Sequence, residues 1–537
     1  MGNEVCGFLK AEGRKIVNGN GQEVLLRGVG LGNWMLPEGY MWKFVHGYDR
    51  PRRIERAIAD LLGEEEAKNF WEKFYDRYIT EADIKKMAEE GFNSVRLPIN
   101  SRFILEEESF DHYIEEHLQI IDRFIGWCKQ YKLYVFLDLH GAPGGQTGAN
   151  IDDSRDNHPD LFRFEENKKK TIALWRMLAN RYKDEWIVGG YDLLNEPLPE
   201  EFKVYNDQLV PLYKDITKAI RQVDQNHLII LEGAHWATDF SIFHEKFDDN
   251  LMLQFHKYWN APDVESIQKY IDKGRELNMP LWLGESGENS LDWFSGTFHL
   301  AEEWNISWCF WPWKKLDTTN SPCSINRPKD WDKVIDYLRG VSKPDPKEAK
   351  EIFDEYLENI LFENCTYHPE VVNAMMRRIP LRIPAEFYGY KGEGISYGGF
   401  SKEQQNIIRK NDKIRNKFAA PNPDGSLEFR NYKAQPDSDA HNLCIELNQG
   451  EWVVYAMNCS NDTRCGIYFR IAAEKENSQI ALELDGHVIL ENFSVSNFDW
   501  EEKAMLHSVL FTQGSHELKL RAVNGTVKLD WIDIVTE

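Results

Sequence analysis

Eight short apolar runs alternate with amphipathic stretches between about residues 24 and 340, and this alternation constrains the fold more than any other feature. The runs are nearly continuous, as expected of parallel strands that are covered on both faces. In the stretch from Tyr113 to Gln130, apolar residues recur at spacings of three and four, which indicates a helix. The eight runs are "VLLRGVGLG" from Val24, "SVRLPI" from Ser94, "YVFLDLH" from Tyr134, "YDLLNE" from Tyr191, "LIILEG" from Leu228, "LMLQFHKY" from Leu251, "PLWLGES" from Pro280 and "SWCFWPW" from Ser307.

Eight strand–helix units in series predict an α/β fold of the (β/α)8 TIM barrel type, over residues 1–345. The alternative, a doubly wound open sheet, would more often carry a glycine-rich phosphate loop after an early strand. The run "GVGLGN" at Gly28 does not fit that pattern. Residues 346–383 begin charged and helical, and are expected to form a connector. Residues 384–537 show short alternating runs between turn residues, which predicts an antiparallel β-sandwich.

The charge balance excludes several classes of partner. The chain has 537 residues, and its 88 acidic against 64 basic side chains give a net charge of -24. Such a potential repels phosphate backbones, so nucleic acid is not an expected partner. We expect no membrane span, because no run approaches 18 apolar residues. The charged start "MGNEVCGFLKAEGRK" favours a cytoplasmic protein, or a secreted one whose signal was removed. The sequence does not indicate an oligomeric state.

Polar residues end most of the predicted strands, where a barrel mouth would expose them. Barrel geometry gathers such residues around one axis, so Glu196 and Glu285 are expected to face each other. Two facing carboxyls suit cleavage of a glycosidic bond, one as a proton donor and the other as a nucleophile; at about 5 Å apart they retain configuration. The other strand-end candidates are Arg96, His140, Asn195, His256, Tyr258 and Trp311. Arg96 would favour the charged form of a neighbouring carboxylate, and Asn195 could hold a sugar's 2-hydroxyl.

The motifs "VRLP", "DLHG", "LLNEP", "FHKY", "LGESG" and "FWPW", in this order, resemble glycoside hydrolase family 5. The resemblance covers roughly residues 10 to 345. It implies that Glu196 is the general acid/base and Glu285 the nucleophile, and that the remaining strand-end residues bind substrate. It implies a retaining mechanism without a cofactor. Trp313 is an alternative to Trp311, because it lies two residues further along the same strand.

The substrate expected from the resemblance is an oligosaccharide or polysaccharide. "LDLHGAPGGQTGANIDDS" and "FWPWKK" look closest to the exo-β-1,3-glucanase and β-glucosidase branch. Long inserts after the first and third strands would narrow the cleft to a pocket and favour exo action. Trp34, Tyr40, Trp42 and Trp259 are candidate sugar platforms. Three alternatives are an endo-β-1,4-glucanase, a non-catalytic sugar-binding protein, and a metal-dependent hydrolase, which the isolated His140 and His256 argue against.

The last 150 residues resemble a carbohydrate-binding module of family 6 or 35, through "IPAEFYGY", "LNQGEWVVYAM" and "HELKLRAVNGTVKLDWIDI". The resemblance implies that an aromatic pair sandwiches a sugar, with Tyr432 and Trp500 as candidates. It also implies a structural calcium, for which Glu386 and Asp530 would supply hard oxygen ligands. Pro384 replaces a polar residue common at that edge, which departs from the pattern of a calcium site.

Overall fold

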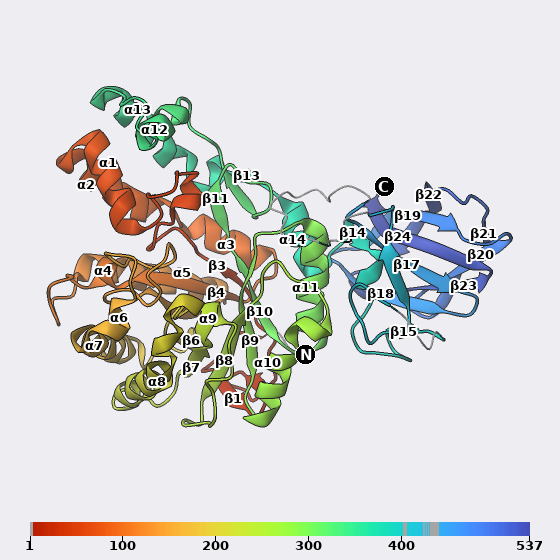
Figure 1. Cartoon of the computed structure of the whole chain (residues 1–537), viewed down its shortest axis with the longest axis horizontal. Helices are drawn as coiled ribbons and strands as arrows, with labels where there is room; N and C mark the ends of the chain where they lie inside the picture. Colours follow the sequence, from red (N-terminus) through yellow and green to blue (C-terminus); the bar gives the residue numbers. More distant parts are fainter. Residues whose placement is uncertain (1–3, 401–404, 423–424, 426, 428, 430–439) are drawn as a thin grey trace. The chain divides into compact units, whose positions relative to one another are not determined.

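The computed structural model describes residues 4–400, 405–422, 425, 427, 429 and 440–537 (Figure 1). The chain divides into two compact units. The first comprises residues 1–257, 269–287 and 306–367, and the second comprises residues 258–268, 288–305 and 368–537.

The first unit contains a closed barrel of eight parallel strands, which confirms the predicted (β/α)8 fold. Each strand pairs with its neighbour in chain order, and the last closes on the first through Trp308–Arg27, Cys309–Gly28 and Phe310–Val29. All eight predicted runs contribute a strand. The strands are β3 (Arg27–Gly30), β4 (Ser94–Asn100), β5 (Tyr134–Gly141), β6 (Val188–Asp192), β7 (Leu228–Glu232), β8 (Leu251–His256), β9 (Leu281–Gly287) and β10 (Ser307–Trp311).

Helices follow the strands because the intervening sequence has one apolar face. In α5 (Glu115–Tyr131), the predicted apolar positions Leu118, Ile121, Ile125 and Cys128 are buried. α3 (Glu81–Glu89) begins at a capping box in which Thr80 and Asp83 satisfy each other's backbone N–H groups. Further helices of the first unit are α4 (Ser101–Ile104), α6 (Asp160–Arg163), α7 (Glu165–Tyr182), α8 (Asn206–Arg221), α9 (Ala234–Ala237) and α12 (Trp331–Leu338). α10 (Val264–Glu276) has residues in both units, and α11 (Leu291–Glu303) belongs to the second unit.

Three additions to the barrel were not predicted as elements. β1 (Lys10–Glu12) and β2 (Lys15–Val17) form a hairpin. β11 (Lys314–Leu316), β12 (Cys323–Ile325) and β13 (Thr366–Tyr367) form a small sheet. α1 (Pro51–Leu62) and α2 (Glu64–Arg77) lie between β3 and β4 in the chain and pack on α13 (Pro346–Asn359). The contact of α2 with α13 is part of an aromatic cluster. In this cluster the Trp42 and Tyr356 ring centroids are 4.7 Å apart.

The second unit contains two antiparallel sheets, which confirms the predicted β-rich C-terminal region. One sheet has the order β16-β17-β24-β19-β22, with β14 also paired to β24, and the other has the order β15-β18-β23-β20-β21. Alternate residues such as Val453, Tyr455 and Met457 are buried in their shared core. The strands are β14 (Leu381–Pro384), β15 (Tyr397–Gly398), β16 (Arg415–Phe418), β17 (Leu443–Asn448), β18 (Trp452–Cys459), β19 (Thr463–Ala473), β20 (Ser478–Leu484), β21 (His487–Val495), β22 (Glu501–Phe511), β23 (Gly514–Asn524) and β24 (Thr526–Thr536).

The predicted connector of residues 346–383 is divided between the two units. Its first helix, α13, belongs to the first unit, where Phe353 contacts Phe70 at 5.2 Å between ring centroids. Its second half, with α14 (Pro369–Met376), belongs to the second unit and packs on α11. Both helices have an apolar face that is buried against a neighbour.

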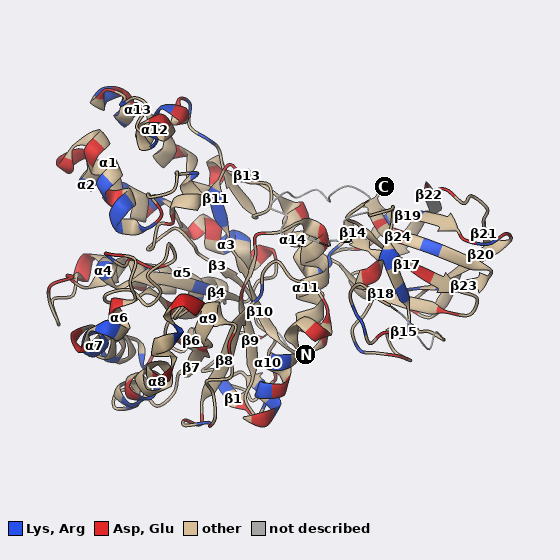
Figure 2. Cartoon of the chain, in the orientation of Figure 1, with Lys and Arg blue, Asp and Glu red and all other residues tan. Residues whose placement is uncertain are grey.

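Acidic and basic side chains are interspersed along surface helices such as α1, α2 and α13 (Figure 2). In the part of the chain that the structure describes, no helix combines the length and apolar character that crossing a membrane requires. The cellular compartment stays a prediction from the sequence.

Candidate active site

Side chains from six barrel strands or the residues just after them meet at the carboxyl ends of the strands. Parallel strands in a closed barrel all point their carboxyl ends to one mouth, so residues distant in sequence become neighbours there. Arg96 lies within β4, His140 near the end of β5, His256 at the end of β8 and Glu285 within β9. Asn195 and Glu196 follow β6, and Trp311 ends β10.

The two predicted catalytic carboxylates lie within reach of one substrate atom. An oxygen of Glu196, an oxygen of Glu285 and a ring nitrogen of His256 all lie within 4.8 Å of one another. Retaining glycosidases hold their carboxyls about 5–5.5 Å apart, whereas inverting enzymes leave roughly 6.5–9.5 Å for a water molecule. The separation therefore suits direct attack by one carboxylate and proton transfer by the other.

Arg96 is the fully buried centre of this site. Its Nη1 donates to Glu285 Oε2 at 2.8 Å and its Nη2 to Asn195 Oδ1 at 2.8 Å. The guanidinium thus fixes both the predicted nucleophile and the residue beside the acid/base. Three further carboxylates contact it, and the sequence analysis did not single them out: Asp138 at 3.2 Å, Asp192 at 2.8 Å and Glu232 at 2.9 Å.

The Glu285 carboxyl has a raised pKa. Burial raises it most, and the Glu196 charge adds to the rise, while His256 and Arg96 lower it. The sequence predicts that Arg96 favours an ionised neighbour. That lowering is present, but burial outweighs it, and the Arg96 charge is shared among several carboxylates. Glu285 therefore ionises at a higher pH than an ordinary glutamate.

His140 is neutral and orients Asn195. Burial and the Arg96 charge lower the pKa of His140 to about 3. The Nδ1 nitrogen donates to Asp138 Oδ2 at 2.7 Å, so Nε2 is left to accept from Asn195 Nδ2 at 3.2 Å. The Trp311 ring lies parallel to the imidazole, with 5.4 Å between centroids and 6° between planes. Asn195 is thereby held with its oxygen toward Arg96 and its amide nitrogen toward His140.

His256 holds the carboxyl of Glu196, with Nδ1 2.7 Å from Glu196 Oε1. Burial alone would lower the pKa of His256, but Glu232, Glu285 and the contact with Glu196 raise it well above its ordinary value. The Nδ1 nitrogen donates to Glu196, and Gln254 Nε2 lies 3.2 Å from the other ring nitrogen. The Glu196 backbone has a left-handed φ of 44°, which is uncommon for a residue with a side chain. Its N–H donates to Glu232 Oε2 at 2.7 Å.

Comparison with known proteins agrees with this geometry, since residues 60–317 match the family model "Cellulase (glycosyl hydrolase family 5)". The barrel carries a glycosyl hydrolase family 5 domain. A beta-xylosidase of Phanerodontia chrysosporium is 37% identical over 265 residues, which cover 47% of this chain and 52% of that protein. The chain thus spans about half the length of this relative.

Two other relatives carry different names. Endoglucanase C of Acetivibrio thermocellus is 26% identical over 46% of this chain and 88% of that protein. A glucan 1,3-beta-glucosidase of Candida oleophila is 29% identical over 55% of this chain and 68% of that protein. The names span exo- and endo-acting proteins, so the comparisons support the domain family and do not select between the two modes.

Of the aromatic residues suggested as sugar platforms in the family 5 domain, Trp34 is a core residue. It is fully buried, its Nε1 donates to Tyr75 O at 2.9 Å, and its ring meets Phe124 edge to face. The sequence could not show this, because the residues that cover Trp34 come from distant helices. Tyr40 is 39% exposed, and its hydroxyl accepts from Trp311 Nε1 at 2.9 Å. This contact distinguishes Trp311 from Trp313, whose Nε1 donates to the buried Asp83.

Tyr258 and Trp259 follow β8 directly and belong to the second compact unit. Their rings are 5.6 Å apart. Trp259 is 42% exposed, and its Nε1 donates to Glu288 O at 3.2 Å. The assignment of both residues to the substrate stays a prediction.

The candidate sugar-binding pair of the second unit is only partly described. Tyr432 lies outside the described residues. Trp500 is half-buried, and its Nε1 donates to Ala419 O at 2.9 Å. Arg470 and Lys528 lie 5.1 and 5.3 Å from its ring centroid, so cations already occupy positions next to the indole. Its role in sugar binding stays a prediction.

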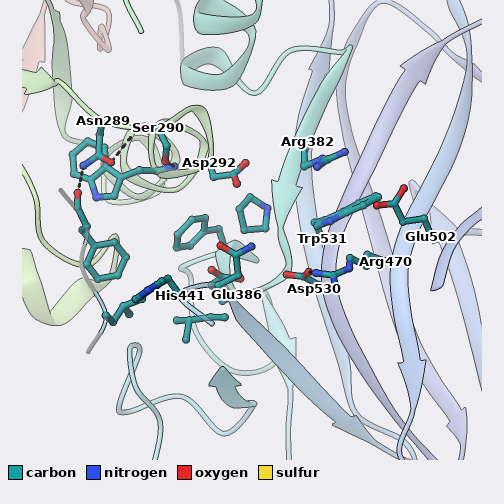
Figure 3. A pocket seen from close by; sticks show the side chains of 17 residues that line it. Asn289, Ser290, Asp292, Arg382, Glu386, His441, Arg470, Glu502, Asp530 and Trp531 are labelled. Atoms are coloured by element: carbon teal, nitrogen blue, oxygen red, sulfur yellow. Dashed lines mark hydrogen bonds and ion pairs between the residues drawn. The ribbon is translucent and has the colours of Figure 1, made fainter. Parts of the chain in front are cut away.

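Glu386 and Asp530, the candidate calcium ligands, line a cavity of about 320 Å³ in the second unit (Figure 3). Asp530 forms an ion pair with Arg470, so a cationic side chain already neutralises it. Glu386 is buried, and its Oε2 has no hydrogen-bond partner among the described residues. Among those residues, only Glu196, His256 and Glu285 form a group of three or more potential ligands with converging atoms. These two carboxylates alone do not make up the six to eight oxygen ligands that calcium takes, and calcium binding here stays a prediction.

The residues missed by the sequence analysis share one recognisable feature. Each is a polar residue inside or at the end of an otherwise apolar strand: Asp138 in "YVFLDLH", Asp192 in "YDLLNE", Glu232 in "LIILEG" and Gln254 in "LMLQFHKY". All four are fully buried. A buried charge needs a partner, so this pattern could have indicated that the three carboxylates share a cation. Gln254 donates to two of them, Asp192 and Glu232.

Proposed function

We propose that this chain is a retaining β-glycoside hydrolase that acts on β-linked glucans or gluco-oligosaccharides. The observation that carries the proposal is the approach of the Glu196 and Glu285 carboxylates to within 4.8 Å of each other and of His256. A non-catalytic sugar-binding barrel would have no use for a convergent carboxylate pair held by a buried arginine.

In the first step, a Glu285 oxygen attacks the anomeric carbon while the protonated Glu196 gives its proton to the departing glycosidic oxygen. The bond between that carbon and oxygen breaks, and a glycosyl ester on Glu285 forms. In the second step, Glu196 takes a proton from water, the water oxygen attacks the anomeric carbon, and Glu285 leaves as a carboxylate. Arg96, 2.8 Å from Glu285 Oε2, stabilises the charge of that leaving carboxylate.

Asn195 supports the oxocarbenium-like transition state in this mechanism. Its oxygen is taken by Arg96, and one amide hydrogen points to His140. The second amide hydrogen can donate to the sugar's 2-hydroxyl. Because both neighbours fix the amide, little conformational entropy is lost when that contact forms.

Exo action is favoured by the two long inserts at the mouth of the family 5 domain. The insert after β3 and the insert after β5 are joined, because Arg50 Nη1 donates to Ser154 O at 3.0 Å and to Ser154 Oγ at 2.7 Å. The second insert is also fixed to the catalytic residues: Gln146 Nε2 donates to the backbone oxygens of His140 and Asn195 at 2.7 and 2.9 Å. Joined inserts of this kind narrow one side of a cleft.

An endo-β-1,4-glucanase is the second candidate, favoured by the similarity to Endoglucanase C. The similarity to a beta-xylosidase adds xylosides to the substrates to be tested. Both candidates use the same carboxylate pair, so they differ only in what the mouth of the barrel admits.

The deciding experiment is a time course of products from laminari-, cello- and xylo-oligosaccharides, resolved by chain length. Monosaccharide released from the start of the reaction supports exo action, and products of middle length support an endoglucanase. The control is Glu285→Gln, which should show no turnover and an unchanged far-UV circular dichroism spectrum. A wild-type rate in this variant would overturn the mechanism.

A further inference from the structure

Glu232 is the last residue of β7 and is fully buried, and it contacts the predicted acid/base through two routes. We propose that Glu232 is a positioning residue that holds both the backbone and the carboxyl of Glu196 in place for proton transfer. The inference rests on the proposed function, since it assumes that Glu196 is the proton donor.

The first route is direct. Glu232 Oε2 accepts the Glu196 N–H at 2.7 Å. Glu196 has a φ of 44°, a left-handed conformation that is unfavourable for a residue with a Cβ. A hydrogen bond from an amide to a carboxylate is one of the stronger kinds in proteins. The contact with Glu232 therefore opposes the strain and helps to keep Glu196 in this conformation.

The second route runs through His256. Glu232 Oε1 lies 3.5 Å from His256 Nε2, and His256 Nδ1 lies 2.7 Å from Glu196 Oε1. The ring thus lies between the two carboxyl groups, with Gln254 Nε2 also 3.2 Å from His256 Nε2. Glu232 and Gln254 on the Nε2 side keep the ring oriented with Nδ1 toward Glu196, and this fixes the Glu196 carboxyl.

Protein donors use both oxygens of Glu232. Oε2 accepts from Glu196, while Oε1 accepts from Arg96 Nη2 at 2.9 Å and from Gln254 Nε2. With both oxygens used in this way, Glu232 acts on the reaction through Glu196. It is a positioning residue and not a second proton donor.

An isosteric amide cannot replace this carboxylate. Glutamine has one oxygen, but donors face both ends of the Glu232 carboxylate. In Glu232→Gln the new amide nitrogen must face either the Glu196 N–H or the Arg96 and Gln254 donors. One of the two contacts is lost while the side-chain volume stays the same.

The experiment compares kcat/KM on two aryl β-glycosides that carry the same sugar and differ in the leaving group. The sugar is the one whose aryl glycosides the wild type hydrolyses faster. Phenol is a poor leaving group and needs the proton from Glu196, whereas 2,4-dinitrophenol leaves without one. Loss of general-acid function therefore falls on the phenyl glycoside. We expect Glu232→Gln to lose about 30- to 100-fold on the phenyl glycoside and less than about threefold on the dinitrophenyl glycoside.

The matched control is Asp192→Asn. Asp192 Oδ2 binds the same two partners, Arg96 Nε at 2.8 Å and Gln254 Nε2 at 3.0 Å, but Glu232 takes the Glu196 N–H. A purely structural defect should lower kcat/KM to the same degree on both substrates, and this is the result that we expect for Asp192→Asn. Glu232→Asp serves as a second variant if Glu232→Gln does not fold. This variant keeps the charge but is one methylene shorter. Its loss of kcat/KM should again be larger on the phenyl glycoside, with a smaller difference between the two substrates.

Equal losses on the two glycosides in Glu232→Gln, or in Glu232→Asp where that variant is used, would overturn the inference while the proposed function stands. A wild type that hydrolyses neither glycoside would overturn the proposed function, and the inference with it. Thermal unfolding of each variant shows that the folded protein is being compared.

Discussion

Replacing Arg96 with lysine tests whether the guanidinium fork organises the barrel core. Arg96 donates at 2.8–2.9 Å to four buried side chains and lies 3.2 Å from the buried Asp138. A lysine ammonium keeps the positive charge but has only three donors on a flexible stem. At least one of the four hydrogen bonds is therefore lost. The four acceptors are Asp192, Asn195, Glu232 and Glu285.

The expected cost follows from this count. A hydrogen bond to a charged group contributes about 1.5–3 kcal/mol, so one lost bond lowers the free energy of unfolding of the barrel by roughly that amount. For a domain of this size, about 2 °C of Tm is lost per kcal/mol. We therefore expect Arg96→Lys to unfold at least roughly 3–6 °C below the wild type.

The assay is scanning calorimetry, combined with the temperature at which half the hydrolytic activity is lost, because the activity reports on the barrel unit. The control is Arg181→Lys, since Arg181 also binds two carboxylates, Asp122 and Glu115, but is partly exposed. A surface pair contributes at most about 1 kcal/mol, so this variant should shift Tm by no more than about 2 °C. If the barrel of Arg96→Lys unfolds within about 2 °C of the wild type, the hydrogen bonds of the Arg96 guanidinium do not stabilise the barrel core as proposed.

Three further predictions follow from the site. Glu196→Gln should lower kcat/KM by roughly 10²- to 10⁴-fold on substrates with poor leaving groups; equal losses on activated aryl glycosides would contradict its role as the acid. The nucleophile Glu285 must be ionised, and burial raises its pKa, so kcat/KM should fall on acidification with a midpoint above the ordinary glutamate pKa of about 4.3. A midpoint at or below that value in the pH profile would contradict this. Since Asp530 is already paired with Arg470, EDTA should leave the Tm of the second unit unchanged, and a fall restored by calcium would show instead that Glu386 and Asp530 bind the ion.

The sequence by itself determined the barrel and its two carboxylates. Parallel strands covered on both faces must be apolar along their length, so the eight runs were visible without a structure. A polar residue at the end of such a run stands out against it. Glu196 and Glu285 were found in this way, because all strands of a closed barrel expose the same ends at one mouth.

Only the tertiary structure decided which polar groups meet. Asp138, Asp192 and Glu232 occur in three different strands, and nothing in their local sequence shows that one guanidinium contacts them all. Trp34 could be placed in the core only once distant helices were seen to cover it. Local sequence specifies the hydrophobic periodicity of a helix or strand and where it ends. The partners of a buried charge are residues from other strands that closure of the barrel brings within about 3 Å. The position of Glu232 beside Glu196 and Arg96 is a property of the closed barrel.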